Sequence, residues 1–129
     1  MQPIHVEIAP GELIDKITIL EIKRERIKDA AKLRNVLAEL ELVAKARDAA
    51  IPASAALARL TAELKVVNET LWEIEDDLRH CERAGDFGGR FIALARSVYR
   101  QNDRRSAIKR QINELLGSGI LEEKSYTPY

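Results

Sequence analysis

The sequence predicts an all-α protein, an antiparallel three- to four-helix bundle with long helices, a short extended N-terminal arm and a C-terminal tail. Hydrophobic residues make up 46% of the chain but aromatic residues only 5%, so the core must consist of aliphatic side chains, which suit helices. Charged residues reach 33%, as in long helices with solvated outer faces. From Leu57 to Cys81, apolar residues alternate between spacings of three and four, and such a heptad seam requires partner helices.

The first residues predict an extended arm. Residues 3–8 alternate apolar and polar side chains, which places Ile4, Val6 and Ile8 on one face of a short strand. A single strand needs a partner, and the C-terminal tail, another subunit and no partner at all remain open. Pro10 is then suited to the first turn of a helix.

Apolar residues at helical spacing continue from residue 11 to residue 50, but their phase slips near residues 30–35. Because neither glycine nor proline interrupts the slip, we favour one long, kinked helix over 11–50. The alternative is two helices, with Asp29 as the N-cap of the second.

Two more helices are expected after Pro52. The first covers residues 54–84, with Ser54 suited to its N-cap and Gly85 to the residue just after its end. The linker that follows is short, so the next helix, over residues 89–116, must return antiparallel.

Residues 117–129 remain as a tail after the last helix. The length of the whole chain, residues 1–129, is typical of one domain.

Polar side chains interrupt the apolar stripes at one height of the predicted bundle. In the last helix, Asn102 and Arg105 occupy core-facing positions where leucine is expected. Counting turns from the loops places Asn68 and Asn35 at about the same level. One interpretation is a polar layer that sets the register of the helices, and the other is a small pocket for a phosphate- or carboxylate-bearing ligand.

The last helix is basic, with seven Lys or Arg residues against two acidic ones, and the helix before it is acidic. Opposite charges on neighbouring helices stabilise one another. Arg96, Arg100 and Arg104 stand one turn apart, and arginine binds carboxylate or phosphate groups in a bidentate manner. Arg96 and Arg100 are therefore candidate ligand-binding residues.

Composition and motifs exclude several classes of function. The formal net charge of zero argues against nucleic-acid and acidic-membrane binding, and no apolar run approaches the ~20 residues of a membrane span. One cysteine cannot form an internal disulfide, which favours a soluble protein in the reducing cytoplasm. Glycine-rich phosphate loops, nucleophile motifs and zinc-ligand spacings are missing, so we expect no cofactor and no metal.

Four stretches, PGELIDKITILEIK, LWEIEDDLR, ARSVYRQNDRR and EEKSY, resemble a family of small bacterial proteins classed only as a domain of unknown function. The resemblance extends over nearly the whole chain, with the motifs in order. It implies a bacterial protein with a single all-helical domain, and it brings no activity and no active site.

These observations favour a non-catalytic, oligomeric helical-bundle protein that acts through interactions of its basic last helix with an acidic partner. Thin helical rods leave apolar area uncovered, so we expect a homodimer. The alternative is a small enzyme or sensor that binds an anionic ligand at Asn35, Asn68, Asn102 and Arg105.

Overall fold

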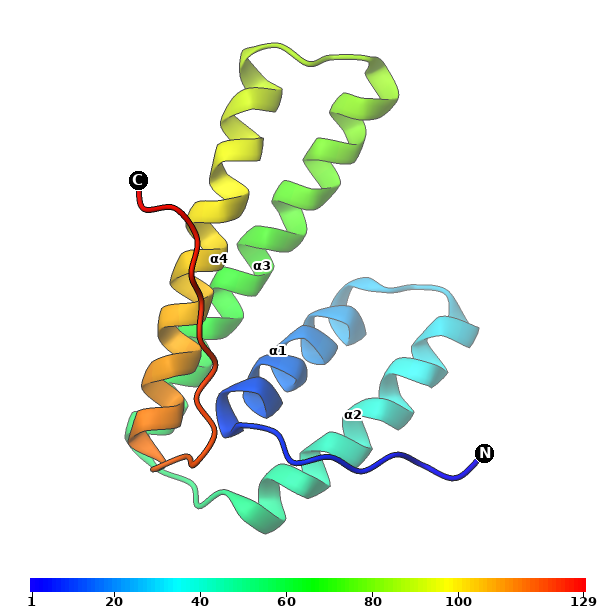
Figure 1. Cartoon of the computed structure of the whole chain (residues 1–129). Coiled ribbons are helices and arrows are strands. Elements are labelled where there is room, and N and C mark those ends of the chain that lie inside the picture. The colour runs from blue at the N-terminus through cyan, green and yellow to red at the C-terminus, as the bar shows by residue number, and fades with distance from the viewer.

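The computed structural model describes residues 1–129 and contains four helices and no strand (Figure 1). The helices are α1 (Pro10–Arg26), α2 (Ala30–Ala50), α3 (Ala55–Ala84) and α4 (Gly89–Leu115). The predicted all-α helical bundle is confirmed. None of the four helices has the length and apolar composition needed to cross a membrane.

The helices form two antiparallel hairpins, α1 with α2 and α3 with α4 (Figure 1). The central helix is α1, because it packs against each of the other three, whereas α2 packs against α1 alone. The far half of the α3–α4 hairpin extends beyond the end of α1, as Figure 1 shows. The two hairpins therefore meet over only part of the length of α3 and α4.

The expected single helix over residues 11–50 is wrong, because the chain turns between α1 and α2. Ile27 leaves the helical conformation, with φ −79° and ψ 129°. Asp29 is also extended, and its carboxylate accepts a hydrogen bond of 3.0 Å from the backbone N–H of Lys32. The alternative, in which Asp29 caps a second helix, is the one observed. The phase slip in the sequence therefore marks a reversal of the chain and not a kink.

Local signals account for both ends of α3. The Ser54 hydroxyl accepts a hydrogen bond of 3.1 Å from the backbone N–H of Leu57 and caps the first turn. Gly85 ends the helix with φ 66°, a left-handed conformation that a side chain disfavours. The chain then returns along α4 after a short linker.

The core has two parts, both built on α1. Between α1 and α2 it contains Ile17, Leu20, Val36 and Leu40. Where α1 meets the α3–α4 hairpin, the buried residues are Ile14, Leu57, Leu60, Leu64, Val67, Ile108 and Ile112. Only the first half of the heptad seam is thus covered by two helices. Farther along α3, Leu71 and Leu78 are half-buried, whereas Ile74 and Cys81 are buried.

Both ends of the chain are extended. The N-terminal arm, residues 1–8, forms no strand, and its side chains are exposed. The C-terminal tail, residues 117–129, folds back along α4 and is the red segment of Figure 1. The two segments differ in their attachment, because hydrogen bonds and ion pairs of side chains hold the tail and none holds the arm.

Candidate functional site

A buried carboxylate lies where α1, α3 and α4 meet. Asp15 of α1 is only 1% exposed. The Arg105 guanidinium of α4 donates to both of its oxygens, from Nε to Oδ1 at 3.0 Å and from Nη2 to Oδ2. The Asn68 amide of α3 donates to the same Oδ1 at 2.9 Å. One carboxylate therefore joins three helices, and we call Asp15, Asn68 and Arg105, together with Thr18, the Asp15 cluster.

Two further hydrogen bonds tie Thr18 into the Asp15 cluster. The Asn68 amide donates a second hydrogen bond of 2.9 Å to the Thr18 hydroxyl, which itself donates to the Asp15 carbonyl at 2.8 Å. The hydrogen bond with Asp15 raises the pKa of the Arg105 guanidinium above its ordinary value. Because a buried charge is stable only when paired, this arrangement holds Asp15 as a structural carboxylate.

Next to the Asp15 cluster, α1 and α4 approach each other closely at Gly11. Its backbone N–H donates to the Asn113 side-chain oxygen at 2.7 Å. A Cβ at position 11 would lie 2.5 Å from the carbonyl oxygen of Lys109, so only glycine fits there. Gly11, Asp15, Thr18 and Ile22 are all buried and follow one another at spacings of four, three and four. This second stripe of α1 is the sequence signal that identifies Asp15 as buried.

The Lys109 ammonium is nearly buried beside the same helix contact. It pairs with Glu12 at 2.7 Å and with Glu122 of the tail at 3.0 Å. Burial by itself lowers the pKa of Lys109, but the hydrogen bonds with the two carboxylates outweigh burial and the pKa is raised. Lys109 thus joins the start of α1, helix α4 and the tail.

The structure brings together only part of the predicted polar layer. Asn68 and Arg105 share Asp15, and Asn102 lies half-buried one turn before Arg105. Asn35 is exposed on α2, which does not contact α3 or α4. Counting turns back from the loop near Pro52 misplaced Asn35 because the count assumed that this helix packs along α3, whereas α2 packs against α1 alone.

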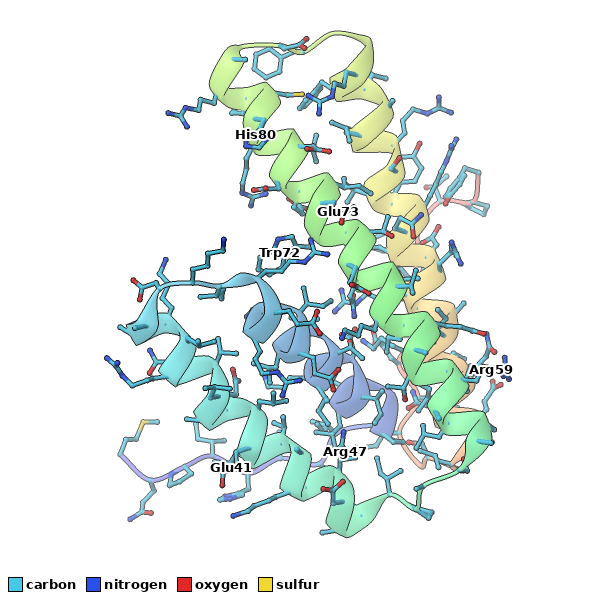
Figure 2. The ribbon with its side chains drawn as sticks, turned by 180° about the vertical axis from the view of Figure 1, so that it is seen from behind. Glu41, Arg47, Arg59, Trp72, Glu73 and His80 are labelled. Atoms are coloured by element: carbon cyan, nitrogen blue, oxygen red, sulfur yellow. The ribbon has the colours of Figure 1, made fainter.

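A cleft of about 520 Å³ opens beside the Asp15 cluster, between the second half of α1 and the α3–α4 hairpin. Asn68, Asn102 and Arg105 line it, together with the apolar side chains of Ile19, Ile22, Leu71 and Trp72 and the charged side chains of Glu75, Asp76 and Arg79. Figure 2 shows Trp72 between α3 and the end of α1. The cleft is thus an aromatic and polar recess where the two hairpins diverge.

Ion pairs and hydrogen bonds hold the C-terminal tail against α4. Asp103 accepts a hydrogen bond of 2.6 Å from the Tyr129 hydroxyl and one of 3.1 Å from Lys124. These bonds lower the pKa of Asp103, and the bond to Asp103 raises the pKa of Tyr129. The Tyr129 ring also meets the Tyr99 ring edge-on, at a centroid distance of 5.1 Å. The ARSVYRQNDRR and EEKSY stretches are therefore in contact.

The seven basic residues of α4 fall into two groups, according to whether they form ion pairs within the chain. Four of them form ion pairs within the chain, namely Arg90 with Asp77, Arg105 with Asp15, Lys109 with Glu12 and Arg110 with Glu114. The other three, Arg96, Arg100 and Arg104, are exposed and lie in none of the ion pairs of the chain. They follow one another at intervals of four residues on the outer face of α4, and we call them the arginine column.

The chain belongs to a family of unknown function, DUF6165, whose model matches residues 4–129. No curated protein and no solved structure matches it. The resemblance read from the four sequence motifs is thus confirmed at the level of an uncharacterised family.

Proposed function

We propose that this member of an uncharacterised family is a non-catalytic interaction protein that binds an acidic segment of a partner protein through the arginine column. The supporting observation is the division of charges on α4. Within α4, Arg90, Arg105, Lys109 and Arg110 are paired with acidic residues of the chain, whereas Arg96, Arg100 and Arg104 are exposed and unpaired. These three guanidinium groups are therefore available to carboxylates of another protein.

The geometry of α4 suits an acidic partner. Residues four apart on a helix are separated by about 6 Å along its axis, so the column presents three guanidinium groups at regular intervals. Each group can bind a carboxylate in a bidentate manner. Because the net charge of the chain is zero, attraction is local and is screened by salt. The buried Asp15 carboxylate, with all its partners in place, offers no free group for acid–base catalysis.

A charge-matched comparison tests this proposal. The probe is a fluorescein-labelled octaglutamate peptide, and its binding is followed by anisotropy at low ionic strength. The triple variant Arg96→Gln, Arg100→Gln, Arg104→Gln should weaken binding about tenfold or more, since each lost contact contributes on the order of 0.5 kcal/mol.

The control removes three exposed basic residues elsewhere, with Lys28→Gln, Lys32→Gln and Arg34→Gln in one variant. It has the same net charge as the column variant and should keep the wild-type affinity. Equal weakening by both variants would show non-specific attraction and would reject the column as the binding site. Tighter binding of a single-stranded oligonucleotide of equal charge would reject the acidic protein as the class of partner.

The cleft supports a second candidate function, binding of a small ligand that carries a phosphate or carboxylate group. Three of the four residues of the predicted pocket, Asn68, Asn102 and Arg105, line the cleft. The Nη1 atom of Arg105 takes no part in the bonds to Asp15, and Trp72 adds a flat aromatic surface. Because Trp72 is the single tryptophan, its fluorescence reports on the cleft. No change in its emission with millimolar anionic metabolites would reject this candidate.

A further inference from the structure

The N-terminal arm is extended but unpaired. No hydrogen bond joins residues 1–8 to the rest of the chain, and Ile4 and Val6 are 78% and 74% exposed. The arm starts from a fixed point, because Ala9 is buried and its carbonyl accepts the first backbone hydrogen bonds of α1. An extended segment with open backbone groups and alternating apolar residues is a strand without a partner.

The chain itself offers no partner for this strand. It contains no other strand, and its second extended segment, the C-terminal tail, is already held against α4 through Lys124 and Tyr129. Any partner strand for the arm therefore comes from another molecule.

The arm is complementary to a second copy of itself. In an antiparallel pair centred on Val6, residues that face each other have numbers that add up to twelve. Val6 then faces Val6, Ile4 faces Ile8, and all three apolar side chains lie on one face of the ribbon. On the other face His5 of each arm lies opposite Glu7 of the other, which places opposite charges together when the histidine is protonated.

We propose that the arms of two copies of this chain pair as an antiparallel two-stranded ribbon centred on Val6 and so form a homodimer. The partner of the arm is thus the arm of a second copy of the chain, because the order of apolar and charged residues in the arm is self-complementary. Since an isolated two-stranded ribbon is only marginally stable, the dimer should dissociate on dilution. This inference does not depend on the arginine column.

Cysteine cross-linking tests the register. In a Cys81→Ala background, which removes the native thiol, Val6→Cys should form a disulfide-linked dimer under mild oxidation, because facing Cα atoms in such a ribbon lie about 4.5–5.5 Å apart. Ile4→Cys alone should cross-link far less, since its facing residue is Ile8. A mixture of the Ile4→Cys and Ile8→Cys chains should give the mixed dimer. Equal cross-linking by Val6→Cys and Ile4→Cys alone would overturn the register.

The oligomeric state tests the pairing itself. Light scattering after size exclusion should show a dimer at about 100 µM, and Val6→Glu, which places two like charges face to face, should give a folded monomer with an unchanged helical circular dichroism spectrum. Glu7→Lys should weaken the dimer, and the double variant His5→Glu, Glu7→Lys should restore it with the charges exchanged. A monomeric wild type, or a Val6→Glu variant that remains dimeric, would overturn the proposal.

Discussion

At the scale of single residues, the Asp15 cluster determines the effect that we expect from substituting Arg105. A polar layer that reaches water tolerates the loss of an arginine, but Asp15 is 1% exposed and cannot be hydrated in its place. The cost of the substitution therefore comes from the carboxylate that is left behind, more than from the contacts of the arginine itself.

Arg105→Met is accordingly expected to lower the free energy of unfolding by about 3–5 kcal/mol, because it leaves a buried charge without its partner. The double variant Asp15→Asn, Arg105→Met should recover most of this loss, since an amide oxygen can still accept from Asn68 and no charge remains buried. Urea denaturation followed by circular dichroism measures both values. A stable Arg105→Met protein would mean that Asp15 is hydrated in solution.

Gly11 gives a second prediction at this scale. Its added Cβ in Gly11→Ala would meet the Lys109 carbonyl oxygen and the Asn113 side chain, so we expect a loss of about 1–3 kcal/mol as α1 and α4 are pushed apart. Gly89→Ala is the matched control, because it lies in the first turn of α4 with nothing within 4 Å of its Cβ. Urea denaturation measures both variants and should show the control to be neutral or slightly stabilised.

The residues of the site were only partly predictable from sequence. Arg105 was found because it interrupts an apolar stripe, and such an interruption is visible in a single chain. Asn68 was found because counting turns from the loops placed it at the same level. Asp15 was missed because an acidic residue in the first turns of a helix also suits the helix dipole, which is the simpler interpretation. The stripe that runs from Gly11 to Ile22 would have revealed it, but glycine and threonine do not register as apolar.

At the scale of secondary-structure elements, helix ends were predictable wherever a local hydrogen bond or a left-handed residue fixes them. Ser54 and Gly85 bound α3 in this way. The turn between α1 and α2 contains the N-cap Asp29 but neither glycine nor proline, and a single aspartate is a weaker signal for a helix end than those residues. Sequence therefore left two alternatives there, and the favoured one was wrong.

The C-terminal tail is an element whose attachment should depend on pH. The pKa of Asp103 is lowered from 3.8 when the tail docks, so Asp103 stabilises the docked tail at pH values above 3.8. This stabilisation is lost as the pH falls through the lower pKa that Asp103 has in the docked state. The pKa of Tyr129 is raised from 10.0 when the tail docks, so Tyr129 stabilises the docked tail at pH values below 10.0. This stabilisation is lost as the pH rises through the higher pKa that Tyr129 has in the docked state.

We therefore expect the end of the tail, at Tyr129, to stay docked between these limits and to be released from Asp103 on either side. The chemical shifts of the Tyr129 ring protons measure this by NMR. Tyr129→Phe should remove the alkaline transition, with the tail then followed through Tyr126, and should keep the acid one. A tail that stays docked in Asp103→Asn at every pH would contradict the role of that carboxylate.

At the scale of the whole molecule, the all-helical class followed from composition and periodicity, whereas the arrangement in two hairpins did not. The heptad seam of α3 predicted partner helices along its whole length. Only its first half is covered by both α1 and α4, because α1 ends at Arg26 and the chain turns away into α2. Which helices meet depends on the direction of the loops between them, and a loop of three or four residues carries little information about its direction.

The arrangement in two hairpins predicts uneven stability. Helix α2 is attached through α1 alone, so it can open without disturbing the core between α1, α3 and α4. Native-state hydrogen exchange should therefore show much faster exchange for backbone amides near Val36 and Leu40 than for those near Ile14 and Ile112. Equal protection in both regions would mean that the four helices unfold as one cooperative unit.

The Asp15 cluster also has a consequence for the order of folding. Its partners stand far along the chain, with Asn68 separated from Asp15 by 53 residues and Arg105 by 90, and Gly11 lies 102 residues from Asn113. During synthesis from the N-terminus, α1 and α2 can form their local hairpin early, but the carboxylate of Asp15 must stay hydrated until α4 has been made. The final docking of α1 is therefore a late step, and the opposed charges of Asp15 and Arg105 bring α1 and α4 into register only after α4 has been made.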